Sequence, residues 1–123
     1  MKNKERVVIL GASDKPSRYS HMALVALLRH GHEAVPVHPR LEEIEGIQVV
    51  NDIDEVRGTV DTVTLYVGPG RLSPMVGSIV ALKPRRIIAN PGAESELMRL
   101  ASERHDIEYV EACTLVMLST GQF

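Results

Sequence analysis

Short apolar runs alternate with longer segments of mixed polarity along the chain. The runs are rich in Val, Ile and Thr, and most are followed by glycine, proline or asparagine, a pattern typical of β-strands. They predict strands over residues 6–10, 33–37, 61–67, 86–89 and 107–111. Continuous apolar runs indicate strands that are buried on both faces, as in a parallel sheet. Pro36 lacks a backbone donor, so we expect its strand at or near a sheet edge.

Helical spacing of apolar residues marks the longer segments between these strands. It predicts helices over residues 18–30, 72–80 and 94–104. Gly31 is expected to end the first helix, and Pro84 bars the second from continuing. In the first and last helices, the residues expected to face the core are Met22, Val25, Ala26, Leu28, Leu97, Met98, Leu100 and Ala101.

Strands that alternate with helices through short connections predict an α/β protein. The sequence therefore predicts a three-layer, doubly wound, mostly parallel sheet in one domain spanning residues 1–123. The middle of the chain has a weaker pattern. There we expect a loop or helical turn over 41–46, a short strand over 47–50 and a short helix over 53–56.

Small and polar residues gather where four successive strands of this sheet are expected to end. These strand ends are residues 11–13, 38–40, 68–70 and 90–92, and Cys113 follows the last strand. Doubly wound sheets bind ligands beyond the carboxyl ends of their strands, where the strand order reverses. We therefore expect a binding site at this edge.

The first of these turns favours a phosphate ligand. Gly11 and Ala12 allow a tight turn and a close approach of a ligand, and the next helix begins with unpaired N–H groups. The glycine fingerprint of dinucleotide enzymes is absent, because Ser13 and Pro16 stand where it has glycines.

The residues after the second strand bear on which nucleotide is bound. NAD sites usually place an acidic residue there, whereas this chain reads Val37-His38-Pro39-Arg40. A basic residue suits a phosphate on the adenosine ribose, which favours NADP or coenzyme A. Lys15, Arg18 and Arg40 are the candidate phosphate partners.

Composition and charge exclude several classes of partner and cellular location. A net charge of −2 and 3% aromatic residues argue against a nucleic-acid partner. The apolar run before Gly11 is too short for a signal peptide or a membrane span, and a single cysteine fits a reducing cytoplasm. We find no catalytic constellation and no pattern of metal ligands. The apolar run over 115–118 is interpreted as core or as a subunit contact, which would make a homodimer or bind another protein.

Two motifs carry a family resemblance. Gly11-Ala12-Ser13-Asp14-Lys15-Pro16 and Val35-Pro36-Val37-His38-Pro39, with the strand over 61–67 and a cysteine near the end, resemble small stand-alone CoA-binding proteins of Rossmann-like fold. These proteins are similar to the CoA-binding domain of succinyl-CoA synthetase α chains and of acyl-CoA synthetases. The resemblance covers nearly the whole chain and implies a ligand rather than a reaction.

The resemblance also implies where each part of CoA lies. The pyrophosphate is expected at Gly11–Lys15, the adenosine 3′-phosphate at residues 38–40, the adenine or pantetheine under Gly68 and Pro69, and the far end of the groove at residues 90–92. The candidate cofactor-binding residues are Gly11, Ala12, Ser13, Lys15, Pro16, Arg18, Val37, His38, Pro39, Arg40, Gly68, Pro69, Asn90, Pro91 and Gly92. Two positions depart from the family pattern: His38 stands where Asn is common, and Ala89-Asn90 stand where Trp and Gln are common.

Cys113 is a candidate contact for the CoA thiol, with which it could form a mixed disulfide. The alternative is that it is a small buried apolar residue. The leading hypothesis is a cytoplasmic module that binds CoA or acyl-CoA and has no catalytic set of its own. One alternative is a small NADP-dependent enzyme or reductase component, and another is a regulatory subunit without a ligand.

Overall fold

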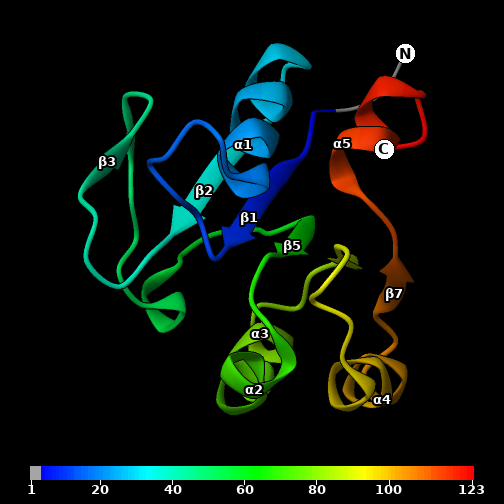
Figure 1. Ribbon diagram of the computed structural model, residues 1–123. Helices are drawn as coiled ribbons and strands as arrows, with labels where there is room; N and C mark the ends of the chain where they lie inside the picture. Colours follow the sequence, from blue (N-terminus) through cyan, green and yellow to red (C-terminus); the bar gives the residue numbers. More distant parts are fainter. Residues whose placement is uncertain (1–3) are drawn as a thin grey trace.

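The computed structural model describes residues 4–123 and has a parallel five-stranded sheet at its centre. In spatial order the strands are β2 (Glu33–Val37), β1 (Arg6–Leu10), β5 (Thr62–Leu65), β6 (Arg86–Ala89) and β7 (Glu108–Glu111). The chain builds β1 and β2 first and then crosses β1 to add the remaining strands on its other side (Figure 1). The strand order therefore reverses between β1 and β5, which is the expected place for a ligand.

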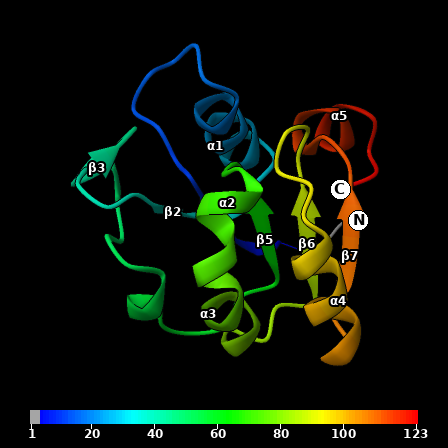
Figure 2. The ribbon, with the colours of Figure 1, turned by 60° about the horizontal axis from the view of Figure 1, so that its bottom comes forward.

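Helices cover both faces of this sheet. One face carries α1 (Tyr19–Arg29) and α5 (Thr114–Ser119), which pack against each other. The other carries α2 (Pro69–Leu72), α3 (Val76–Ala81) and α4 (Glu96–Arg104), as Figures 1 and 2 show. Two 3-10 helices, η1 (Ile53–Glu55) and η2 (Ser73–Met75), complete the helical elements. The three layers confirm the predicted doubly wound α/β fold.

Two hydrophobic clusters fill the spaces between the sheet and its helices, and β1 supplies both. Val8 and Leu10 belong to the cluster under α2, α3 and α4, whereas Val7 and Ile9 belong to the cluster under α1 and α5. Successive side chains of a strand point to opposite faces, so one continuous apolar run serves both cores. Burying a side chain of this size contributes roughly 1.5–3 kcal/mol.

The strand predictions hold closely where the apolar runs are sharpest. The ranges of β1, β2 and β6 match the predicted ones residue for residue. Pro36 lies in β2, which is an edge strand, as predicted. Its backbone faces the open side of the sheet, where its carbonyl accepts a hydrogen bond from Val50 N (2.9 Å). The missing N–H therefore breaks no bond between β1 and β2.

The predicted buried faces of α1 and α4 are wrong in part. Met22 is 38% exposed, and Leu97 and Leu100 are 50% and 41% exposed. The buried residues of α1 are Ser20, His21, Ala23, Leu24 and Leu27, and those of α4 are Met98 and Ser102. Polar residues can be buried on these faces because their side chains form hydrogen bonds. The Ser102 hydroxyl, for example, donates to the Met98 carbonyl (2.7 Å).

Two local predictions also need correction. The segment predicted as a loop and a short strand is a hairpin of β3 (Glu43–Ile44) and β4 (Ile47–Gln48). Its two turn residues, Glu45 and Gly46, both have positive φ, as a tight hairpin turn requires. The predicted helix over 72–80 begins earlier, at Pro69, and passes through η2, which contains Pro74. The apolar run over 115–118 lies within α5.

A buried ionic cluster ties the two ends of the described chain to the amino edge of the sheet. Arg86, the first residue of β6, is 6% exposed and donates to Thr62 Oγ1 (3.2 Å) and to the Phe123 carbonyl (3.4 Å). It also pairs with the Glu5 carboxylate (3.4 Å), and its guanidinium lies 4.5 Å from the centre of the Phe123 ring. These contacts lie at the edge opposite the carboxyl ends of the strands.

Gly11 is the residue that fixes the turn after β1. Its φ is +91°, and a Cβ atom there would lie 2.8 Å from the Tyr66 carbonyl oxygen and 2.9 Å from Val67 Cγ1. Both the backbone conformation and the space therefore require glycine. This contact is the meeting point of the ends of β1 and β5.

We predict that Gly11→Ala destabilises the fold by about 2–5 kcal/mol, since it adds overpacking to backbone strain. Gly31→Ala is the matched control, because Gly31 has φ +83° but no atom within 4 Å of an added Cβ. It should cost only the backbone strain, about 1–3 kcal/mol. Urea denaturation of both variants measures the difference. Equal losses would show that the contact between Gly11 and Tyr66 is not tight in solution.

Candidate functional site

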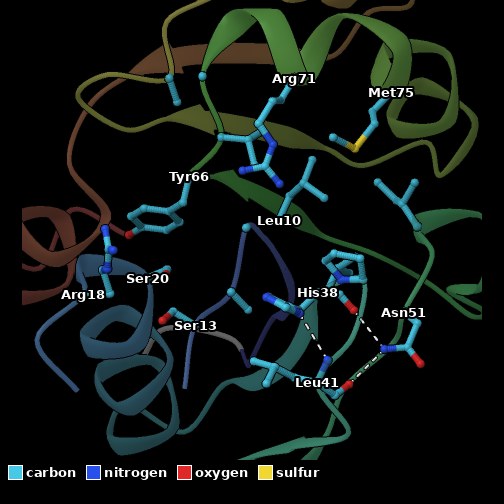
Figure 3. A pocket seen from close by; sticks show the side chains of 18 of the residues that line it. Leu10, Ser13, Arg18, Ser20, His38, Leu41, Asn51, Tyr66, Arg71 and Met75 are labelled. Carbon is cyan, nitrogen blue, oxygen red and sulfur yellow. Dashed lines mark hydrogen bonds between the residues drawn. The ribbon is translucent and has the colours of Figure 1, made fainter. Parts of the chain in front are cut away.

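A groove of about 1010 Å³ crosses the carboxyl ends of β1, β2 and β5 and continues under the first turns of α1 and α2 (Figure 3). It lies over the point where the strand order reverses. Most of the candidate residues line it, namely Gly11, Ala12, Ser13, Lys15, Arg18, Val37, His38, Pro39, Arg40, Gly68, Pro91 and Gly92. The remaining candidates, Pro16, Pro69, Asn90 and Cys113, do not line it.

The loop after β1 and the start of α1 form a site suited to an anion. Lys15 N donates to Ser13 Oγ (3.1 Å), which folds the loop back on itself. Arg18 precedes α1, whose first turn has no side-chain cap and no acidic residue. The first N–H groups of a helix have no partner within it, and they lie at the positive end of its dipole. Figure 3 shows the Arg18 side chain on the same side of the groove, so charge and free donors coincide.

His21 holds this loop in place from beneath. The side chain is buried, and its Nδ1 lies 2.9 Å from the Ser13 carbonyl oxygen. Its Nε2 lies 3.2 Å from the Glu45 carboxylate, in the turn of the β3–β4 hairpin. A carbonyl oxygen only accepts hydrogen bonds, so Nδ1 carries the proton. One imidazole thereby connects the anion loop to the hairpin.

Asn51 holds the turn after β2. Its Nδ2 donates to the carbonyl oxygens of His38 (2.9 Å) and Leu41 (2.8 Å), as the dashed lines in Figure 3 show. The His38 N–H donates in turn to the Val50 carbonyl (3.0 Å). This turn carries Arg40 into the wall of the groove.

Arg71 is a groove residue that sequence reasoning missed. It lies in α2, and its side chain points into the groove from the wall opposite α1 (Figure 3). The available signal was its place in the first helical turn after β5, at the same edge of the sheet as Arg18, which precedes the helix after β1. That signal was obscured because Gly68-Pro69-Gly70 was assigned only to the end of the strand. In the structure Pro69 is the first residue of the helix, a position that proline favours.

Four cationic side chains of the groove have no ion-pair partner among the described residues. Lys15, Arg18, Arg40 and Arg71 all line it, and none of them forms an ion pair with a carboxylate of residues 4–123. The acidic residues at the groove are Asp14, Asp52 and Asp54. The Asp52 carboxylate is occupied as the cap of η1, where it accepts from Asp54 N (2.8 Å). Unpaired cations on several walls suit a ligand with more than one anionic group.

Asn90 does not reach the groove, and its side chain is held by hydrogen bonds within the protein core. It is 2% exposed, and its Nδ2 donates to Thr64 Oγ1 (2.7 Å) and to the Leu65 carbonyl (2.8 Å). Its Oδ1 accepts from Thr114 N (2.9 Å), at the start of α5. The side chain thus ties β5, β6 and α5 together. Cys113, directly before α5, is half-buried.

The Tyr66 ring lines the groove, but its hydroxyl is buried without a hydrogen-bond partner in the described part of the chain. The neighbouring hydroxyls of Thr64 and Thr114 bond to each other instead (2.8 Å). Burial raises the pKa of Tyr66 to about 12, against a smaller lowering by those two hydroxyls. The phenol therefore stays neutral at physiological pH.

Two further structural findings limit the chemistry. Within residues 4–123, no group of three or more His, Cys, Asp or Glu side chains is placed to hold a metal ion. In the same range, no helix is long and apolar enough to cross a membrane.

The fold and the groove define a Rossmann-like class of α/β protein, and sequence comparison identifies the family. The model of the CoA binding domain family matches residues 5–119, so this chain belongs to that family. The recognition made from the glycine turn and the segment after β2 is thereby confirmed.

The chain is also similar to individual proteins. Uncharacterized protein YneT of Bacillus subtilis is 33% identical over 66 residues, which cover 54% of this chain and 49% of that protein. The match thus spans about half the length of this curated relative. A crystal structure of an uncharacterized protein is 40% identical, with a TM-score of 0.93 over 99% of this chain and 100% of the other.

A larger protein contains the same fold. The dinucleotide-forming acetyl-coenzyme A synthetase 1 of Ca. Korarchaeum cryptofilum, in complex with phosphate and ADP, gives a TM-score of 0.77 at 16% identity. The match covers 89% of this chain and 26% of the synthetase. At this identity the likeness concerns the fold.

The buried Tyr66 hydroxyl predicts a dependence of stability on alkaline pH. The pKa of this phenol is raised from 10.0 to about 12 on folding, so the folded state keeps its proton longer. The free energy of unfolding should therefore fall between pH 10 and 12, by up to roughly 2–3 kcal/mol. Tyr66→Phe should remove this contribution and, at pH 7, match or exceed the wild type by about 1 kcal/mol.

Urea denaturation of both proteins at pH 7 and about pH 11 measures this difference. Tyr19→Phe is the control, because Tyr19 is 70% exposed and should leave the pH dependence unchanged. If Tyr66→Phe loses stability as steeply as the wild type, the hydroxyl is not the group that titrates.

Proposed function

We propose that this chain is a binding module for coenzyme A or acyl-CoA, with the ligand held in the groove and no reaction of its own. The observation that carries the proposal is the set of four unpaired cations, Lys15, Arg18, Arg40 and Arg71, around one groove in a member of the CoA binding domain family. Coenzyme A is an elongated ligand with a pyrophosphate in its middle and a separate phosphate on its ribose, so it needs basic groups at more than one place.

Two parts of the groove match these two anionic groups. The anion site at Ser13, Lys15 and the start of α1 offers backbone donors and a helix dipole, which suit the pyrophosphate. The turn after β2 offers Arg40 and His38, which suit the ribose phosphate. Arg71 reaches the groove from the opposite wall, where it would close over the ligand between them.

The turn after β2 also favours CoA over NAD. An NAD site requires a carboxylate for the ribose hydroxyls at the end of this strand. Here the position holds His38 and Arg40, and no acidic residue follows the strand until Glu42. A cytoplasmic location and a homodimeric or other protein partner remain predictions from the sequence.

Thermal unfolding with CoA, acetyl-CoA, dephospho-CoA, NAD and NADP tests the proposal. A ligand at about a hundred times its dissociation constant stabilises the folded state by roughly 2.7 kcal/mol, which raises the melting temperature measurably. We expect a rise with CoA or acetyl-CoA that exceeds the rise with NAD or NADP. A rise with NADP alone would replace the proposal with an NADP-binding function, and no rise with any of them would remove it.

Single substitutions test the residue assignment. Lys15→Ala, Arg40→Ala and Arg71→Ala should each weaken CoA binding by roughly 1–3 kcal/mol, the range for a hydrogen bond to a charged group. Isothermal titration calorimetry measures the affinities. Arg29→Ala is the matched control, since Arg29 is an exposed cation at the opposite end of α1 from Arg18. A loss of affinity as large in the control would assign the effect to net charge rather than to the groove.

A further inference from the structure

The turn after β2 is unusual in how its backbone donors are paired. The N–H groups of Arg40 and Leu41 both donate to the same atom, Nδ1 of His38, at 3.0 and 3.1 Å. The carbonyls of His38 and Leu41 accept from Asn51. A side-chain acceptor that bonds the backbone two residues later is the feature by which Asn and Asp form tight turns. In this chain an imidazole nitrogen has that role.

This pairing fixes where the proton of the imidazole lies. Two N–H groups point at Nδ1, so that nitrogen must present its lone pair and cannot carry a proton. The neutral ring therefore carries its proton on Nε2. A proton on Nδ1 would leave the N–H groups of Arg40 and Leu41 without their acceptor. The position of the proton on the ring is therefore linked to the conformation of the turn.

The other edge of the ring is available to a ligand. His38 is half-buried and lines the groove, with its ring beside the anion loop in Figure 3. Its Nε2 forms no hydrogen bond with any residue of the described range, 4–123. The Arg40 side chain, which the turn carries, lines the same groove and is unpaired. The same turn thus contributes both an unpartnered ring nitrogen and an unpaired guanidinium to the groove.

We propose that His38 is a positioning residue, whose Nδ1 holds the turn that presents Arg40 and whose Nε2–H donates to a phosphate oxygen of the ligand. The donor half of this proposal rests on the proposed function, whereas the turn half does not depend on a ligand. The two roles require different features of the side chain: the turn needs an acceptor close to the backbone, and the ligand contact needs a donor on the far side of the ring.

Two substitutions separate these demands. His38→Asn keeps an acceptor that can bond the Arg40 N–H but has no donor at the position of Nε2. His38→Ala removes both. Neither substitution touches the hydrophobic clusters, of which His38 is not a member, so both variants are expected to fold. Their thermal unfolding confirms this before other measurements.

Hydrogen exchange without ligand tests the turn. The amides of Arg40 and Leu41 should exchange about tenfold faster in His38→Ala than in the wild type, because they lose their acceptor. In His38→Asn the Arg40 amide should stay close to wild-type protection. The ring ¹⁵N signals of the wild type at pH 8 should show Nδ1 without a proton and Nε2 with one. Equal exchange in wild type and His38→Ala would overturn the role of the turn.

Calorimetry with CoA and dephospho-CoA tests the donor. His38→Asn should bind CoA about tenfold more weakly than the wild type, and His38→Ala more weakly still. For dephospho-CoA, which lacks the ribose phosphate, wild type and His38→Asn should differ by less than for CoA. The donor role is wrong if His38→Asn binds CoA as tightly as the wild type does, or if it loses the same affinity for CoA and for dephospho-CoA. In either case Nε2 does not donate to the ribose phosphate.

A double-mutant cycle with Arg40→Ala tests whether His38 acts through Arg40. The losses of His38→Ala and Arg40→Ala should not add, since removing His38 already releases the turn, whereas those of His38→Asn and Arg40→Ala should add. Additive losses for His38→Ala would contradict the positioning role. If the wild type binds no CoA, the proposed function fails, and the exchange measurements still decide the role of His38 in the turn.

Discussion

The approach of Gly11 to the Tyr66 carbonyl is the constraint on which the rest of the structure depends. It brings the ends of β1 and β5 together, and from there the chain leaves in opposite directions, to α1 on one face and to α2 on the other. Because these two connections diverge, nothing in the main chain fills the space above the sheet at that point. The groove is the geometric result of a reversed strand order, and its walls are the first turns of the two helices.

Polar side chains near this point, of which His21 and Asn90 are buried, hold the walls in place. His21 supports the anion loop, Asn51 supports the turn after β2, and Asn90 fixes the start of α5. Each connects segments that are distant in sequence, so none of them could be replaced by an apolar residue without leaving backbone groups unpaired. The cationic residues of the groove, in contrast, are unpaired with any described carboxylate. The groove thus has a frame of hydrogen-bonded side chains that connect distant segments, and charged side chains that have no ion-pair partner among the described residues.

The sequence predicts some features of the fold and the groove better than others, because different interactions determine them. The strands were predictable because short continuous apolar runs that end at a glycine, such as residues 7–10, are typical of buried parallel strands. The helix faces were predicted less well, since Ser20, His21 and Ser102 are buried for hydrogen bonding, which hydrophobic spacing does not detect. The hairpin after β2 was missed because its turn residues, Glu45 and Gly46, gave only one of the usual signals. Gly11, Lys15, His38 and Arg40 were predictable at the groove, because strand ends of a parallel sheet converge. Arg71 and Asn51 were not, since their roles depend on where α2 and the chain after β4 fold.

The ionic cluster around Arg86 has a consequence for how this fold is used. Glu5 and Phe123 meet at that arginine, at the edge of the sheet opposite the groove. Polypeptide attached at either end would therefore extend away from the ligand, so the unit can be fused within a longer chain without blocking its own entrance. The same fold occupies about a quarter of the acetyl-coenzyme A synthetase chain, 26%, which is an arrangement that such a placement of ends permits.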